Sequence, residues 1–162
     1  MPGWAGKLAE RIREQERKRQ EEQHHQEQRR AAFRENAPQC WAQLVEIIQR
    51  DVAEFNQVFA DVPAARVQYR RFPDSLRLPP EKVRVSRTGY VLAHAEAFLD
   101  VDLETVEVRL SRKVAHEGFA QEKAIKFKLV MDDAGVVHLL HGEKPVSLEQ
   151  ASEIVLFPVL SP

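Results

Sequence analysis

Between residues 39 and 59, apolar side chains recur at steps of three or four positions. The repeating residues are Trp41, Leu44, Ile48, Val52, Phe55 and Phe59. In an α-helix this spacing places them all on one face, and Val45 and Ile47 broaden that face. The pattern therefore predicts a long amphipathic helix that can cover a sheet.

From residue 64 onward the hydrophobic period falls from 3.6 to 2, which indicates strands with one buried face. The alternating segments lie near residues 67–70, 83–86, 90–93, 106–111, 125–131 and 136–140. Turn signals at residues 86–89 and 132–135 separate neighbouring segments. We expect five or six strands in an antiparallel meander, with a proline-rich loop at residues 72–80.

A second, shorter helix is predicted after the strands. Ser147 and Gln150 stand at capping-box spacing, and Pro158 is expected to end the helix. The predicted fold class is α+β. It comprises an antiparallel β-meander of five to six strands packed by the long amphipathic helix and the short C-terminal helix, with an N-terminal projecting charged helix.

The first 35 residues have a different character. From Glu10 to Arg30, 13 of 21 residues are charged and Ile12 is the only large apolar one, so the helix predicted there has no core face. Opposite charges three or four apart, such as Glu14 and Lys18, add roughly 0.2–0.5 kcal/mol per pair. No apolar seam continues through three heptads, which argues against a self-sufficient coiled coil. We therefore divide the chain into a charged helical arm, residues 1–35, and an α+β globular domain, residues 36–162.

The junction between these segments is the sequence Asn36-Ala37-Pro38. Asn36 is expected to cap the helix that follows, and Pro38 suits its first turn. The sequence leaves open whether the junction is a break between two helices or a kink within one.

The ends of the arm carry its large apolar side chains. They are Trp4, Leu8, Ile12 and Phe33. Such residues suit contact with a protein partner or with a second copy of the chain in a homo-oligomer. The alternative is a solvated or partly frayed helix without a partner.

The 162 residues include 24 basic and 25 acidic side chains, for a net charge of −1. In the arm, nine basic minus seven acidic residues leave only +2. This balance argues against nucleic acid as a partner. No run approaches the roughly 20 apolar residues of a membrane span, and the N-terminus lacks an apolar signal core. One cysteine, Cys40, excludes an intramolecular disulfide, so we expect a cytoplasmic protein.

Charge in the domain falls in blocks of one sign. Residues 66–87 hold seven basic and two acidic side chains, whereas residues 88–108 hold five acidic and no basic ones. Opposed charges on neighbouring strands stabilise a sheet by roughly 0.2–1 kcal/mol per pair. We therefore expect cross-strand pairing on the wet face, with a basic surface for an acidic partner as the alternative.

Residues that could carry chemistry are few. Asp100, Asp102 and Glu104 could converge on a hard cation such as calcium if they lie in a loop. Val101 and Leu103 alternate with them, which favours an ordinary half-buried strand. The six histidines lack zinc-site spacing, and there is no phosphate loop, dinucleotide fingerprint or nucleophile elbow. We expect no cofactor, and an enzyme is the less favoured class.

Three functional hypotheses follow from the sequence. The first is a non-catalytic protein-interaction or assembly module that uses the N-terminal helix as its contact arm. The alternative is a small-molecule or lipid binding protein with a pocket between the curved sheet and the helix. Its candidate lining is Trp41, Phe55, Tyr90, Phe98 and Phe127. An enzyme with a site assembled from distant residues is a third, weaker hypothesis.

Overall fold

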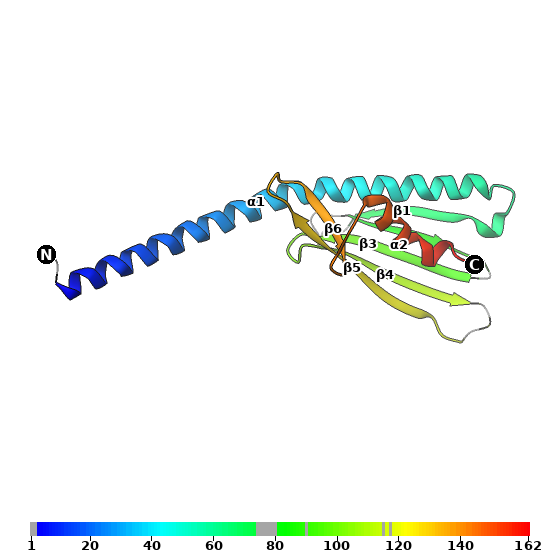
Figure 1. Ribbon diagram of the computed structural model, residues 1–162. Coiled ribbons are helices and arrows are strands. Elements are labelled where there is room, and N and C mark those ends of the chain that lie inside the picture. The colour runs from blue at the N-terminus through cyan, green and yellow to red at the C-terminus, as the bar shows by residue number, and fades with distance from the viewer. Residues whose placement is uncertain (1–2, 74–80, 90, 115, 117) are drawn as a thin grey trace. The chain divides into compact units, whose positions relative to one another are not determined.

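The computed structural model describes residues 3–73, 81–89, 91–114, 116 and 118–162 (Figure 1). Its elements are α1 (Trp4–Val58), the 3-10 helix η1 (Pro63–Ala65), β1 (Val67–Pro73), β2 (Glu81–Arg87), β3 (Val91–Asp100), β4 (Thr105–Val114), β5 (Gln121–Met131), β6 (Val137–His141), β7 (Lys144–Val146) and α2 (Leu148–Leu160). The chain divides into two compact units, residues 1–35 and 36–162, which we call the arm and the body.

The arm is the first part of α1, and its charges pair along the helix. The guanidinium of Arg17 lies 2.7 Å from the carboxylate of Glu14 and 2.8 Å from that of Glu21. The predicted pair of Glu14 and Lys18 is also present, at 3.8 Å. The hydrogen bond from Arg17 lowers the pKa of Glu14 below its ordinary value. All these side chains are exposed, so the pairs support the helix weakly and less at high salt.

At the junction, α1 continues through Pro38, so of the two alternatives that the sequence left open the break between two helices is excluded. Asn36 is not a helix cap either. Its Nδ2 donates to the Gly135 carbonyl at 3.1 Å and lies 3.9 Å from the Met131 sulfur. The Asn36 side chain thus makes a tertiary contact with the β5–β6 loop. Pro38 has no backbone N–H, so α1 lacks one helical hydrogen bond at this position.

The seven strands form one antiparallel sheet in sequence order, β1 to β7. The predicted meander is confirmed, with one strand more than expected. The additional strand, β7, has three residues, too few for an alternating pattern to be visible in the sequence. Most of the expected loop at residues 72–80 lies outside the described residues, but Phe72 and Pro73 still belong to β1.

One face of the sheet is apolar and covered. Strand register places alternate residues of β2 to β6 on this face, including Val83, Val85, Ala95, Ala97, Val106, Val108, Ile125, Phe127, Leu129 and Leu139, all of them buried. Helix α2 packs across β2, β3 and β4 (Figure 1). The body part of α1 supplies the other cover, with Trp41, Leu44 and Ile48 buried. Both packing helices of the predicted α+β fold are therefore confirmed.

Polar contacts fix the two helices in place. Ser152 of α2 is fully buried, and its hydroxyl donates to Asp51 of α1 at 2.7 Å. At the C-terminal end of α1, the Asn56 amide donates to the Val67 carbonyl at 2.8 Å and accepts from the Val67 N–H at 2.9 Å. The helix is thereby tied to the first residue of β1.

Helix α2 begins as predicted and ends later than predicted. Ser147 and Gln150 form the expected capping box. Pro158, however, lies inside the helix, which continues to Leu160. Proline keeps a helical φ, and it costs only one backbone donor when a helix is near its end. The expectation that Pro158 stops the helix is therefore wrong.

Two arginines of the covered face hold the last turn of α2. Arg87 of β2 donates to the Leu160 carbonyl at 3.0 Å, and Arg112 of β4 donates to the Ser161 hydroxyl at 2.7 Å. Arg112 also lies 3.5 Å from the Pro158 carbonyl and donates to the backbone oxygen of Pro162. Positive charge is favourable at this end because the last carbonyls of a helix lack intrahelical partners.

We expect Arg112→Ala to lower the free energy of unfolding by about 1.5–3 kcal/mol, because charged hydrogen bonds to the end of α2 are lost. Chemical denaturation checks this. Lys113→Ala is the matched control, since Lys113 is the next residue of β4 and is exposed. Equal effects of the two substitutions would show that the contacts of Arg112 do not stabilise α2.

The β5–β6 loop is organised by one carboxylate. Oδ1 of Asp132 accepts from the N–H groups of Ala134 and Val136, both at 2.9 Å, and Oδ2 lies 2.8 Å from Nε2 of His138. The His138 hydrogen bond, followed by those two backbone groups, lowers the pKa of Asp132 below its ordinary 3.8. Gly135 completes the turn with a φ of +81°, a conformation that favours glycine.

Because the pKa of Asp132 is lower in the folded chain, its carboxylate stabilises the fold above pH 3.8, and this contribution is lost as the pH falls through the folded value. We expect Asp132→Asn to lower the free energy of unfolding at neutral pH. The deficit should shrink as the pH falls below 3.8 and through the lower pKa of the folded state, where the native carboxylate becomes protonated. Denaturation series across this pH range measure the effect, and a pH-independent deficit would contradict it.

Candidate functional site

The arm presents an apolar stripe at its N-terminal end. Trp4 is 80% exposed, Leu8 48% and Ile12 56%. Residues four apart lie on the same side of a helix, so the three side chains form one continuous strip, which we call the N-terminal stripe. Phe33, the fourth residue of the expected contact set, is by contrast only 5% exposed.

The open face of the sheet carries a hollow of about 390 Å³. It is lined by His94, Glu96, Glu107, Arg109, Leu110, Ser111, Glu122, Lys123 and Ala124. Two of its carboxylates are held by arginines. Arg84 Nε donates to Glu96 at 2.7 Å, with Lys82 at 3.6 Å, and Arg109 lies 3.2 Å from Glu107. The expected pairing between the basic and acidic blocks is thus confirmed at Glu96.

The pKa of Glu96 records two opposing effects. Burial of the carboxyl raises its pKa, while the hydrogen bond from Arg84 and the charges of Arg84 and Lys82 lower it. The net result is a pKa below the ordinary value of 4.5. The Glu96 carboxylate therefore stays ionised in this hollow and balances the positive charges of Arg84 and Lys82 on β2.

Removal of the Arg84 guanidinium should leave burial as the main influence on the pKa of Glu96. In Arg84→Ala the desolvation of Glu96 remains while its main hydrogen bond is lost, so we expect the pKa of Glu96 to rise. Carboxyl chemical shifts followed by NMR across pH 2–7 measure it. Arg71→Ala, which removes a cation paired with Glu81 and not with Glu96, is the control. An unchanged titration in Arg84→Ala would contradict this account.

The three carboxylates proposed as weak metal ligands lie at the β3–β4 turn. Asp100 ends β3 and its Oδ1 accepts from the Leu103 N–H at 3.0 Å, while Glu104 has a φ of +53°. Residues 101–104 are therefore a turn, and the half-buried strand expected there is wrong. The Asp100 side chain is used to close that turn. In the described ranges of the chain, no group of three His, Cys, Asp or Glu side chains could hold a metal ion.

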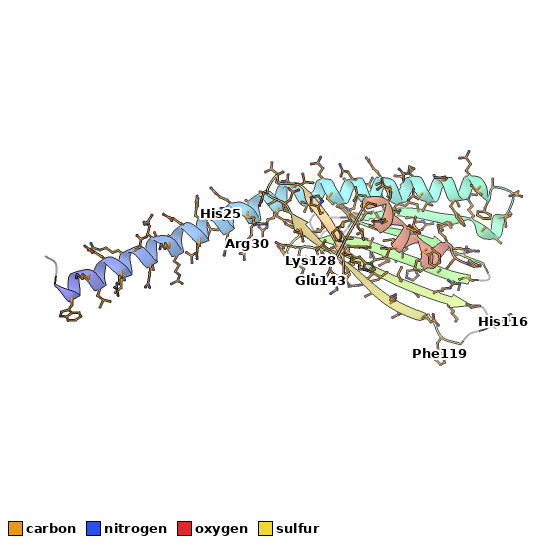
Figure 2. The ribbon with its side chains drawn as sticks, in the orientation of Figure 1. His25, Arg30, His116, Phe119, Lys128 and Glu143 are labelled. Carbon is orange, nitrogen blue, oxygen red and sulfur yellow. The ribbon has the colours of Figure 1, made fainter. Side chains whose placement is uncertain are left out.

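The histidines are dispersed over the molecule. His138 lies against Asp132 on the open face, whereas the ring of His141 lies 5.5 Å from that of Phe127, so the two histidines point to opposite faces of the sheet. His24 contacts Gln28 at 3.0 Å in the arm. His116 is at the β4–β5 connection (Figure 2).

The five aromatic residues expected to line a pocket are distributed over different layers. Trp41 and Phe127 are buried in the core of the covered face. Phe98 lies on the opposite face of the sheet, with the Arg109 guanidinium 5.2 Å from its ring. The ring centroids of Phe55 and Phe59 lie 4.7 Å apart. Tyr90 lies outside the described residues.

The structure also shows a groove that the sequence did not reveal. It has a volume of about 710 Å³ and lies between α2 and strands β5 to β7. Its apolar lining is Ile125, Val146, Ile154, Phe157 and Pro158, and its polar residues are Lys123, Lys126, His141, Gln150 and Glu153. Phe157 is 66% exposed.

Comparison with family models, with curated proteins and with solved structures gave no match for this chain. The fold and surfaces define an α+β protein with a one-sided meander sheet. Among the helices in the described ranges, none has the length and apolar character to cross a bilayer.

Proposed function

We propose that this protein is a non-catalytic interaction or assembly module and that the N-terminal stripe is its contact surface. The observation that carries the proposal is the exposure of Trp4, Leu8 and Ile12 on a helix that is otherwise charged. Exposed apolar residues scattered singly need no explanation, but a continuous strip that includes a tryptophan is typical of a binding surface.

The arrangement suits recognition of a helix by a groove. In that mode, side chains at positions i, i+4 and i+8 insert into an apolar groove of the partner. Lys7, Glu10, Arg11 and Arg13 surround the strip and supply a polar rim. The partner is either another protein with such a groove or a second copy of this chain.

Two further observations support a module without catalysis. In the hollow of the open face, the Glu96 and Glu107 carboxylates are engaged by arginines. Burial also raises the pKa of the Cys40 thiol, which makes it a poor nucleophile. A free, buried cysteine suits a reducing compartment, and on that basis we place the module in the cytoplasm.

The small-molecule or lipid alternative remains a sequence-based prediction. Of the aromatic residues on which that hypothesis was built, the four that the structure describes, Trp41, Phe55, Phe98 and Phe127, line neither the hollow nor the groove. We therefore favour the interaction module.

A photo-crosslinking experiment tests the contact surface. A benzophenone amino acid replaces Leu8 in the full chain, and cells expressing it are irradiated. We expect a discrete adduct, whose mass distinguishes a second copy of the 18.7 kDa chain from another protein. The control places the same amino acid at Glu10, two residues and about 200° around the helix.

Replacing Trp4 by alanine measures how much this side chain contributes to association. With the probe at position 8, Trp4→Ala should weaken association by roughly thirtyfold, as expected for a buried tryptophan anchor worth about 2 kcal/mol. Adduct yield against concentration measures it. Equal adducts from positions 8 and 10, or none from either, would overturn the proposal.

A further inference from the structure

Helix α2 packs on the sheet with one side and lines the groove with another (Figure 1). Its residues in the groove are Gln150, Glu153, Ile154, Phe157 and Pro158. Steps of three or four positions place all five on one face of the helix. The strand side of the groove adds the apolar residues Ile125 and Val146. Because the Phe157 side chain is 66% exposed, this face offers apolar surface to a partner.

The N-terminal stripe matches this face in length. Trp4 and Ile12 are eight positions apart, and so are Gln150 and Pro158. At 1.5 Å per residue, each surface runs about 12 Å along its helix. Leu8 is the middle residue of the stripe, and Ile154 is the middle residue of the groove face. A strip of protruding apolar side chains and an apolar groove of the same length suit the helix-in-groove mode of recognition.

Charges beside the two surfaces are complementary. Arg11 follows Leu8 by three positions, so it lies next to the stripe on the arm helix. Glu153 lies in the groove next to Ile154. Both side chains are exposed, and neither makes an ion pair with another described residue. When the arm helix packs antiparallel to α2 with Leu8 against Ile154, Arg11 and Glu153 come to the same side of the contact. The antiparallel direction also places opposite helix dipoles side by side.

We propose that the N-terminal stripe of one copy inserts into the groove of a second copy, so that chains associate head to tail. This inference rests on the proposed contact arm and names the surface that the arm binds. The stripe and the groove are different surfaces of one chain, so the contact is heterologous. A copy that has inserted its stripe still has a free groove. Association therefore continues beyond a dimer, into rings or longer assemblies.

Two variants that each lack one surface test this geometry. The stripe variant carries Trp4→Ala, Leu8→Ala and Ile12→Ala, and the groove variant carries Phe157→Lys. A lysine is compatible with the last turns of α2, where positive charge is favourable. We expect the native chain to form species larger than a dimer, and each variant alone to associate at least about thirtyfold more weakly. An equimolar mixture should associate again but stop at a dimer, because only one stripe and one groove remain. Sedimentation velocity over a range of concentrations measures all four samples.

The matched control for the groove variant is Leu103→Lys. Leu103 is 65% exposed, close to the value for Phe157, but it lies in the β3–β4 turn, outside both surfaces. This substitution should leave association unchanged.

A charge reversal on exposed residues gives a second test that does not depend on the packing of α2. Arg11→Glu and Glu153→Arg should each weaken association by roughly threefold to tenfold, as expected for a pair at the rim of an interface. The chain that carries both changes should regain the native dissociation constant. A double variant weaker than either single variant would contradict the pairing.

A disulfide reports which residues meet. Leu8→Cys in one chain and Ile154→Cys in another are mixed and mildly oxidised, since facing residues come within the Cα separation that a disulfide spans. We expect a linked dimer from the mixture and none from either variant alone. Glu10→Cys mixed with Ile154→Cys is the control, because position 10 lies on the far side of the arm helix. The native Cys40 is buried and gives little background.

Three outcomes overturn the proposal. They are a native chain that is monomeric at all concentrations, a Phe157→Lys chain that associates as tightly as the native one, and a linked dimer from Leu8→Cys alone, which would show that two stripes meet each other. Photo-crosslinking at position 8 of the Phe157→Lys chain separates this inference from the proposed function. An adduct that persists there assigns the stripe to a different surface, whereas a native chain without any adduct overturns the contact arm itself.

Discussion

The one-sided apolar face of the sheet is the constraint on which the body depends. A meander with period-two alternation buries one face, and that face must be covered or the sheet is not stable in water. Here the cover comes from two helices that lie at opposite ends of the body sequence. Ser152 with Asp51 and Asn56 with Val67 hold those helices to each other and to the first strand. Because α2 uses one side for the core, its other side is left with exposed apolar residues along the groove.

The distribution of charge on the open face follows from strand order. Basic β2 lies beside β3, so Glu96 finds Arg84 and Lys82 as neighbours, and those charges cancel within the molecule. At β5 the situation differs. Glu122 and Lys126 stand where the sheet ends, next to backbone groups that no described strand uses. Charged side chains and backbone groups that no described strand pairs with thus lie together at this edge.

Predictions from the sequence were confirmed where residues close together in the sequence decide the local structure. The capping box at Ser147, the turn at Asp132–Gly135 and the alternation of strands all depend on neighbours in the sequence. They failed where a tertiary contact outweighed a local preference. Asn36 donates to the β5–β6 loop instead of capping a helix, and α2 continues past Pro158 into a last turn that Arg87 and Arg112 bind. Of the candidate surfaces, the stripe of Trp4, Leu8 and Ile12 could be read from helical spacing alone.

The sequence by itself determined the α+β class, the meander and the separate character of the charged arm, because hydrophobic period and charge pattern are properties of consecutive residues. Only the tertiary structure decided which strand edge is left unpaired, where α2 ends, and on which face Phe98 lies. These depend on where each strand begins and ends against its neighbour, which is decided by contacts between residues far apart in the chain. The groove and the edge of β5 belong to that second group, since β6 is too short to cover β5.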